Sequence, residues 1–222
     1  MKVLFIGDIV GKVGRLTLKG LLSNLVDRYK IDIVIANGEN MAGGFGITEK
    51  TADEVLACGV NIITSGNHIW DKKESVPYIA KKNRILRPVN YPPGVPGFGS
   101  IVHTISNGTK VGIINISGRV FMPALDCPFR VGEKEIEKLR ESTKIIIVDF
   151  HAEATSEKIA FGYFIDGKVS AVVGTHTHVQ TADEKILPNG TAYITDVGMT
   201  GPAISVIGVE KEQIIDRFLH QM

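Results

Sequence analysis

Seven short runs of apolar, mostly β-branched residues recur along the chain, and each is bounded by glycine or polar residues. The runs cover residues 2–7, 31–36, 60–64, 110–116, 144–150, 169–173 and 191–195. Each run is too short for a helix, so the pattern predicts strands. Several runs are apolar at nearly every position rather than at alternate ones, which is typical of strands that are covered on both faces.

Helical periodicity separates the first three of these strands. Apolar residues recur every three to four positions from Leu18 to Tyr29, and Thr48 is the expected N-cap of a helix that ends near Gly59. The first third of the chain is therefore predicted as β-α-β-α-β, with parallel strands because such crossovers are right-handed. Residues 133–141 and 210–220 predict further surface helices, and Ser156 is a candidate cap for another short one.

A single domain is expected over residues 1–222, because a chain of this length buries a full core without disulfides. The stretch from residue 87 to residue 99 is rich in proline and glycine and too irregular for a core element. We expect a long loop or small cap at about residues 84–126. The two cysteines, Cys58 and Cys127, are too few for a disulfide framework and are interpreted as buried small apolar residues.

Charge and hydropathy exclude some functional classes. The 25 basic and 24 acidic residues nearly cancel, and no basic stripe or aromatic stacking motif is present. A protein that holds nucleic acid through phosphate neutralisation is therefore not expected. No apolar run approaches the roughly 20 residues that span a bilayer, and the apolar start is too short for a secretory signal. We expect a cytoplasmic protein with no membrane contact and no stable nucleic-acid complex.

Residue types that bind metals or move protons follow six of the seven predicted strands. They are Asp8, Glu39, Asn40, Asn67, His68, His151, Glu153, His176, His178 and Asp196. Ligand sites in open α/β sheets form beyond the carboxyl ends of the strands, so these side chains should converge on one crevice. Alternation along an extended chain would also place the imidazoles of His176 and His178 on one face.

Taken one at a time, several of these residues have ordinary structural explanations. Asp8, Glu39 and Asn67 are of types that favour turns and helix caps, and His151 is compatible with a core imidazole. Their common position at strand ends favours a shared site, and carboxylate, amide and imidazole donors suit manganese, iron or zinc. The donors exceed the need of one tetrahedral ion and suit two ions that share a carboxylate, so we predict a two-metal centre.

Neighbouring residues have other interpretations. The glycines of residues 7–14 lack the spacing of a nucleotide-binding motif, so a glycine cradle for a nucleotide is not expected. Residues 41–46, M-A-G-G-F-G, predict a flexible loop near the metals. Trp70 and Asp71 are expected to pack and to cap the start of a helix, with contact to a substrate base as the alternative for Trp70.

Several motifs resemble those of calcineurin-like metallophosphoesterases. Residues 66–68, G-N-H, are similar to one element of that superfamily, and residues 174–178, G-T-H-T-H, are similar to its closing G-H-x-H element. Val10 replaces the histidine of the usual first element, and Glu39 stands where the bridging aspartate would be. These departures resemble one branch, the bacterial YmdB-like phosphodiesterases, whose motifs G-D-I-V-G, N-G-E-N and D-F-H-A-E-A-T-S-E-K are matched here.

The resemblance covers residues 1 to about 220 and implies a fold and a set of roles. The implied fold is an α/β sandwich of two mixed β-sheets flanked by helices, and because the family usually continues further, C-terminal β-structure is expected to be missing. Two transition-metal ions are implied, iron first and manganese as an alternative. Asp8 and His178 would bind one ion, with Asn40 as a further ligand or substrate contact. Asn67, His151 and His176 would bind the other ion, and Glu39 would bridge the two.

The implied reaction is the hydrolysis of 2′,3′-cyclic nucleotides to nucleoside 3′-phosphates. A hydroxide that bridges the metals would attack the phosphorus, and His68 would face the substrate as general acid. The expected partner is a small cyclic nucleotide or a short RNA end. A phosphomonoesterase, an RNA phosphodiesterase and an amide hydrolase remain alternatives, as does a regulatory nucleotide- or RNA-binding protein with a metal site and little turnover. The oligomeric state stays open, with a homo-oligomer among the options.

Overall fold

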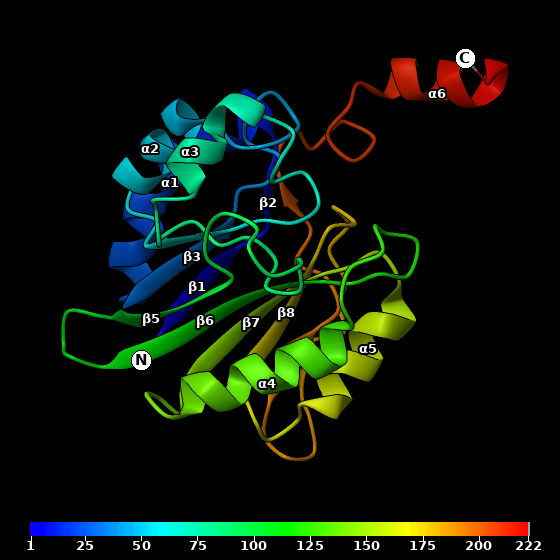
Figure 1. Ribbon diagram of the computed structural model, residues 1–222. Helices are drawn as coiled ribbons and strands as arrows, with labels where there is room; N and C mark the ends of the chain where they lie inside the picture. Colours follow the sequence, from blue (N-terminus) through cyan, green and yellow to red (C-terminus); the bar gives the residue numbers. More distant parts are fainter. Residues whose placement is uncertain (222) are drawn as a thin grey trace.

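Two β-sheets pack face to face between two layers of helices in the computed structural model, which describes residues 1–221 (Figure 1). The strands are β1 (Val3–Ile6), β2 (Asp8–Ile9), β3 (Ile33–Asn37), β4 (Ile62–Thr64), β5 (Ser100–Thr104), β6 (Lys110–Ser117), β7 (Ile146–His151), β8 (Ala171–Thr175), β9 (Lys185–Ile186), β10 (Ala192–Ile194) and β11 (Met199–Thr200). The helices are α1 (Gly11–Tyr29), α2 (Glu49–Ala57), α3 (Val76–Ile79), α4 (Pro128–Arg140), α5 (Thr155–Phe164) and α6 (Lys211–His220), with a 3-10 turn η1 at Lys73–Ser75.

The two sheets differ in size and direction. One has the strand order β1-β3-β4 with parallel pairs, so the predicted β-α-β-α-β arrangement is confirmed. The other has the order β5-β6-β7-β8-β10-β9, parallel from β6 to β10 and antiparallel at both edges. Directly after β1 in the sequence, β2 pairs in parallel with β11 as a separate two-stranded sheet. The expected α/β sandwich is confirmed, but only the larger of its two sheets is mixed; the smaller sheet is wholly parallel because right-handed β-α-β crossovers join all of its strands.

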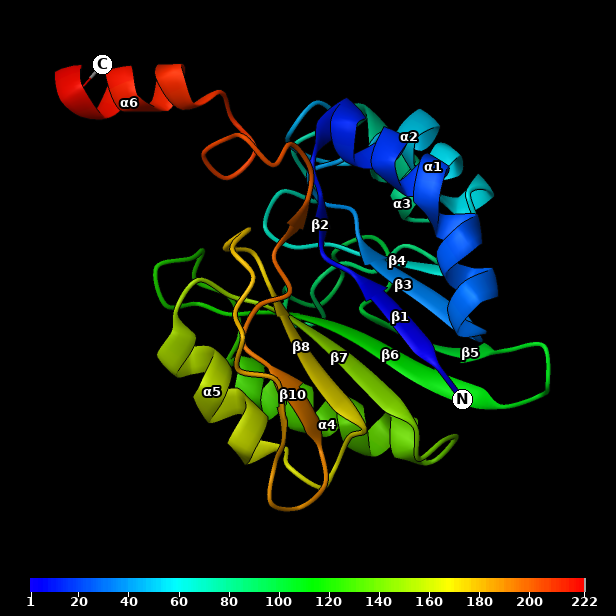
Figure 2. The ribbon, with the colours of Figure 1, turned by 180° about the vertical axis from the view of Figure 1, so that it is seen from behind.

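Burial on both faces explains why the strands are apolar at nearly every position. In β3, Val34 and Ala36 pack in the cluster that contains residues of α1 and α2, whereas Ile33 and Ile35 pack in the cluster between the two sheets. A third cluster joins the outer face of the large sheet to α4 and α5. Figure 2 shows the same order of layers from behind, helices, sheet, sheet and helices.

All seven predicted strands are present, and four short or edge strands, β2, β5, β9 and β11, were not predicted. Thr48 caps α2 as predicted, through a reciprocal capping box with Thr51. The cap prediction for Ser156 is wrong, because α5 has Ala154 at its N-cap position and Ser156 lies inside its first turn. Tertiary contact holds this turn instead, since the buried Glu157 carboxylate accepts hydrogen bonds from the backbone of the loop at residues 119–120.

The remaining segments lie outside the two sheets and their covering helices or connect them. Residues 87–99 form turns and bends, joined to the core by a bridge between Leu86 and Phe98, and the β5–β6 hairpin follows them. Both cysteines are free and half-buried rather than fully buried. Helix α6 projects away from the sheets, and none of its residues is buried (Figures 1 and 2). Among the described residues, no helix has the length and apolar character needed to cross a membrane.

Candidate metal centre

The predicted site residues come together at the carboxyl ends of strands from both sheets. Asp8 lies in β2 directly beyond β1, residues 39–40 follow β3, and residues 67–68 follow β4. From the large sheet, His151 is the last residue of β7, and residues 176–178 follow β8. Several of them line a cleft of about 570 Å³, among them Glu39, Asn40, His68, His176 and His178. The predicted convergence on one crevice is therefore confirmed.

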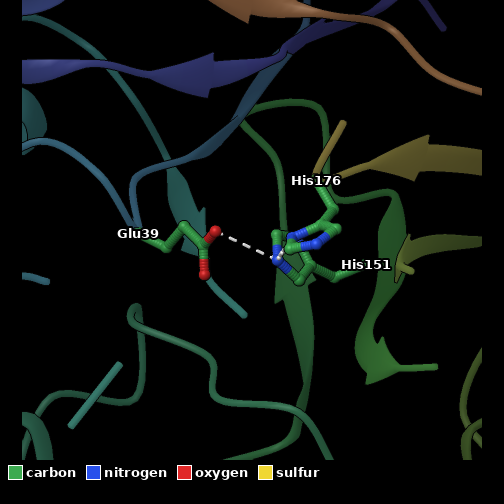
Figure 3. A group of neighbouring side chains, drawn as sticks. All are labelled: Glu39, His151 and His176. Carbon is green, nitrogen blue, oxygen red and sulfur yellow. Dashed lines mark hydrogen bonds and ion pairs between the residues drawn. The ribbon is translucent and has the colours of Figure 1, made fainter. Parts of the chain in front are cut away.

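His151 is the centre of the first group of donor atoms. Its Nε2 lies 3.0 Å from Glu39 Oε1, 3.2 Å from Asn67 Oδ1 and 3.0 Å from His176 Nδ1. Figure 3 shows the Glu39 carboxylate facing the two imidazoles across this gap. Ligand atoms of Glu39, His151 and His176 all lie within 4.8 Å of one another, a spacing that fits a bound metal ion.

The hydrogen bonds behind His151 define which ring nitrogen carries a proton. The Thr175 hydroxyl donates its only hydrogen to Asp149 Oδ1 at 2.6 Å, so it can only accept from His151 Nδ1, at 2.9 Å. Neutral His151 therefore presents a bare Nε2 to the three neighbouring donor atoms. Electron pairs crowded in this way need a positive charge between them, and a cation fits that requirement.

The second group consists of Asp8, Asn40 and His178. The Asn40 amide lies 2.9 Å from His178 Nε2 and 3.3 Å from Glu39 Oε1, and His178 Nε2 is 3.8 Å from Asp8 Oδ1. Asp8 is fully buried, and its Oδ1 has no hydrogen-bond partner among the residues that the structure describes. A buried carboxylate oxygen without a partner is costly unless an ion satisfies it, so this group also fits a cation.

The other two histidines are oriented in the same manner as His151. His176 Nε2 lies 3.1 Å from Glu153 Oε2, and His178 Nδ1 lies 2.9 Å from the carbonyl oxygen of Ile207. An acceptor on one ring nitrogen places the proton there and leaves the opposite nitrogen bare, which is the usual support of a metal-ligating histidine. Glu153, predicted among the residue types that bind metals or move protons, orients the His176 ring.

The charges around the centre shift its pKa values strongly. Burial raises the pKa of Asp8 to about 8, against the effect of His151. Burial opposes the protonation of His151, but the Glu39, Asp8 and Asp149 carboxylates outweigh it and raise the pKa to about 9. Burial and the neighbouring His151 lower the pKa of His176 to about 3. Without an ion, a proton on His151 supplies the positive charge that the surrounding carboxylates require.

Gly66 is required by the close approach of the donor atoms. A Cβ at this position would lie 2.1 Å from His151 Nε2 and 2.4 Å from Glu39 Oε2. No side chain other than hydrogen leaves room for the cluster, which gives a physical reason for the glycine of the G-N-H motif.

His68 lies at the edge of the cluster rather than in it. Its backbone N–H donates to Glu39 Oε2 at 3.2 Å, and its Nδ1 is 2.7 Å from Asp71 Oδ2. Asp71 therefore orients the His68 ring and does not cap a helix, since Lys72 precedes η1. Trp70 packs on Tyr91, with ring centroids 5.8 Å apart, and is not among the residues that line the cleft.

The turn that carries His176 and His178 differs from the sequence-based expectation. β8 ends at Thr175, and both histidines have left-handed backbones, with φ of 101° and 65°. The two imidazoles thus approach the centre through a strained turn and not through strand alternation. Asp196 Oδ2 holds the turn by accepting from the Thr177 hydroxyl at 2.8 Å and from the Thr177 N–H at 3.2 Å.

Lys158 completes this support and was not found from the sequence. Its Nζ lies 2.6 Å from Asp196 Oδ2, and both side chains are 1% exposed. The signal was a lone lysine in a largely apolar helix after a strand, but such a residue is usually a solvated one. Asp149 and Thr175 were also missed, because their contacts join residues that are distant in the sequence.

Comparison with known proteins agrees with this geometry. Residues 4–222 match the family described as YmdB-like protein. The 2′,3′-cyclic-nucleotide 2′-phosphodiesterase of Bacillus subtilis (strain 168) is 51% identical over 98% of this chain and 82% of its own length. A putative phosphatase/phosphodiesterase of Mycoplasma pneumoniae is 43% identical over 98% of this chain and 79% of its own.

Solved structures show the same architecture. A hypothetical protein from Thermus thermophilus superimposes with a TM-score of 0.94 at 44% identity, covering 100% of this chain and 86% of that one. A novel phosphatase from Mycoplasma pneumoniae gives 0.91 at 42% identity, covering 98% and 79%. The match across nearly the whole chain, with the site residues gathered at one crevice, shows that this chain belongs to the family of YmdB-like proteins.

Proposed function

We propose that this protein is a metal-dependent phosphodiesterase that hydrolyses 2′,3′-cyclic nucleotides to nucleoside 3′-phosphates. The observation that carries the proposal is the crowding of three donor atoms within 3.2 Å of His151 Nε2. A cation stabilises such an arrangement, and it would also satisfy Asp8 Oδ1, which no described residue meets with a hydrogen bond. The Bacillus relative at 51% identity is named for this reaction, which supports the substrate class.

Two ions are proposed, one in each group of donors, with Glu39 between them. The ligand sets are Asp8, Asn40 and His178 for one ion, and Asn67, His151 and His176 for the other. Oxygen and imidazole donors without thiolates suit iron and manganese. Bound there, the ions would provide a hydroxide nucleophile near neutral pH and neutralise the phosphate oxygens that it approaches.

His68 supplies the proton in this proposal. Asp71 engages Nδ1, so Nε2, on the opposite side of the ring, is the atom that can hold and release a proton toward the cleft. The departing ribose 2′ oxygen is a poor leaving group until it is protonated. A positioned general acid is worth about 10² to 10⁴ in rate.

The test is hydrolysis of 2′,3′-cyclic AMP by protein loaded with iron or manganese, with the product identified chromatographically. We expect 3′-AMP and about two ions per chain by elemental analysis. His68→Ala should lower kcat by roughly 10² or more while keeping its metal. Glu39→Gln should lose metal as well as activity, because the site loses the negative charge between two cations.

His220→Ala is the matched control, since this exposed histidine lies on α6 and interacts with Asp216 of the same helix. Full metal content without turnover of any cyclic nucleotide would refute the enzymatic proposal and favour a regulatory binding protein. Loss of metal in His68→Ala would show that His68 is a ligand and not the acid.

A further inference from the structure

The loop after Glu39 and Asn40 presents an aromatic side chain at the mouth of the cleft. Phe45 is 55% exposed and lines the cleft, although its neighbours Met41 and Ile47 are fully buried. Its ring lies edge to face on His68, with centroids 5.0 Å apart and an interplanar angle of 63°. Exposed Ile207 and Val209 line the same cleft, and apolar side chains gathered beside polar groups at a cleft are typical of a ligand site.

The loop is anchored at its base, so the position of Phe45 is defined. The Met41 carbonyl accepts a hydrogen bond from Arg15, and the Ala42 N–H donates to the Gly46 carbonyl at 3.1 Å. Gly43 and Gly44 turn the chain with φ of 74° and 101°, which glycine adopts without strain. Residues 41–46, predicted as a flexible loop near the metals, form a turn closed by the Ala42–Gly46 hydrogen bond, and Phe45 directly precedes its closing residue Gly46.

The cleft divides into a polar floor and an apolar rim. The floor is defined by the lining residues Glu39, Asn40, His68, His176 and His178, and the rim by Phe45, Ile207 and Val209. Glu39 and Asn40 are 1% and 2% exposed, whereas the three rim side chains are 38% to 55% exposed. Ile207 is 53% exposed, and its carbonyl oxygen accepts from His178 Nδ1, so this side of the rim is tied to the floor. The floor suits a phosphate and the rim suits a flat apolar group attached to it.

We infer that Phe45 is a platform on which the nucleobase of the substrate stacks. The inference rests on the proposed function and extends it to the base. With the cyclic phosphate on the floor and the ribose oxygen at His68, the ribose lies beside the ring that touches His68, and its base reaches the rim. Stacking uses the face of the base, which all nucleobases share, so the platform accepts purines and pyrimidines.

The test compares a substrate that has a base with one that has none. 2′,3′-cyclic AMP and glycerol 1,2-cyclic phosphate contain the same five-membered phosphodiester, and only the first can stack. Stacking on an aromatic side chain is worth about 1–3 kcal/mol per base, or roughly 5- to 150-fold. Phe45→Ala should raise KM for 2′,3′-cyclic AMP within this range and leave kcat/KM for the glycerol compound within about twofold.

Phe45→Trp should retain the wild-type KM, because the platform needs only an aromatic face. Phe164→Ala is the matched control, since this half-exposed phenylalanine ends α5 at the far end of the helix from the cleft. An equal loss of kcat on both substrates in Phe45→Ala would overturn the inference and show that Phe45 only positions His68. An unchanged KM for the nucleotide would also overturn it.

Binding separates this inference from the proposed function. Calorimetry on metal-loaded protein with 3′-AMP and with inorganic phosphate requires no turnover. Phe45→Ala should weaken the binding of 3′-AMP and leave that of phosphate unchanged. If the wild type turns over no cyclic nucleotide but shows this difference, the platform stands and the catalytic proposal falls. If 3′-AMP binds no more tightly than phosphate in the wild type, the platform is refuted.

Discussion

Replacing Lys158 with methionine removes one charge from a buried ion pair that supports the His176–His178 turn. Lys158 lies in α5 with its Nζ 2.6 Å from Asp196 Oδ2, and each side chain is 1% exposed. Methionine fills a similar volume but leaves the Asp196 carboxylate without a counter-charge. Asp196 keeps hydrogen bonds from Thr177 and from the Gly198 N–H, so the variant should fold.

The expected loss of stability follows from this geometry. Removing one partner of a buried pair costs about 3–5 kcal/mol because the remaining charge is uncompensated. The hydrogen bonds that Asp196 retains place the expected loss near the lower limit, at about 3 kcal/mol. For a chain of this size, that corresponds to a fall in Tm of roughly 6–12 °C. The double variant Lys158→Met/Asp196→Asn should recover part of the loss, since no unpaired charge stays buried.

Urea unfolding of the metal-free protein measures the four free energies of this double-mutant cycle. Lys50→Met, at an exposed position of α2, is the matched control and should change stability by less than about 0.5 kcal/mol. The affinity for Mn²⁺ should also fall in Lys158→Met, because Asp196 holds the backbone between two ligands. A loss below about 1 kcal/mol, or a double variant no more stable than Lys158→Met, would refute the reasoning.

Two further changes test the site and the large sheet. Gly66→Ala should abolish metal binding in elemental analysis, because its Cβ would lie 2.1 Å from His151 Nε2; a variant that keeps its metal would contradict the steric argument. The matched Gly20→Ala meets nothing within 4 Å inside α1 and should gain about 0.5–1 kcal/mol. Against the effect of burial, hydrogen bonds from threonines, Thr195 included, hold the pKa of Asp183 below its usual 3.8. A carboxyl group whose pKa is lowered on folding stabilises the folded protein at pH values above its unfolded pKa. The difference in free energy of unfolding between wild type and Asp183→Asn should therefore be fully present at about pH 6 and should shrink below about pH 4. Equal differences at the two pH values, measured by urea unfolding, would contradict this.

Much of the architecture could be predicted because the relevant signals are local. Among the seven predicted strands, β3, β6 and β7 are buried at nearly every position, and this burial on both faces produces uninterrupted apolar runs that need no knowledge of neighbours. The pairs β2 with β11 and β10 with β9 involve two-residue strands, which have no periodicity of their own. The partner of β2 is about 190 residues away in the sequence, so only the folded protein defines that pair, whereas β9 and β10 form a local hairpin whose first strand is too short to recognise.

The candidate site divides in the same way. Asp8, Glu39, Asn67, His151 and His176 could be named from the sequence because parallel strands bring their carboxyl ends to one edge of a sheet. The residues that support these ligands through hydrogen bonds and ion pairs could not be named from the sequence. Lys158, Asp149 and Asp71 are ordinary charged residues in the sequence, and their roles arise from burial and from contacts across the fold.

The sequence by itself thus determined the seven predicted strands, their order, and which side chains follow them. Only the tertiary structure decided which nitrogen of each histidine is bare, how the left-handed turn at His176 and His178 is held, and that Phe45 rather than Trp70 stands at the cleft. The physical reason is that periodicity is a property of neighbouring residues, whereas desolvation, charge pairing and proton placement depend on groups that only folding brings together.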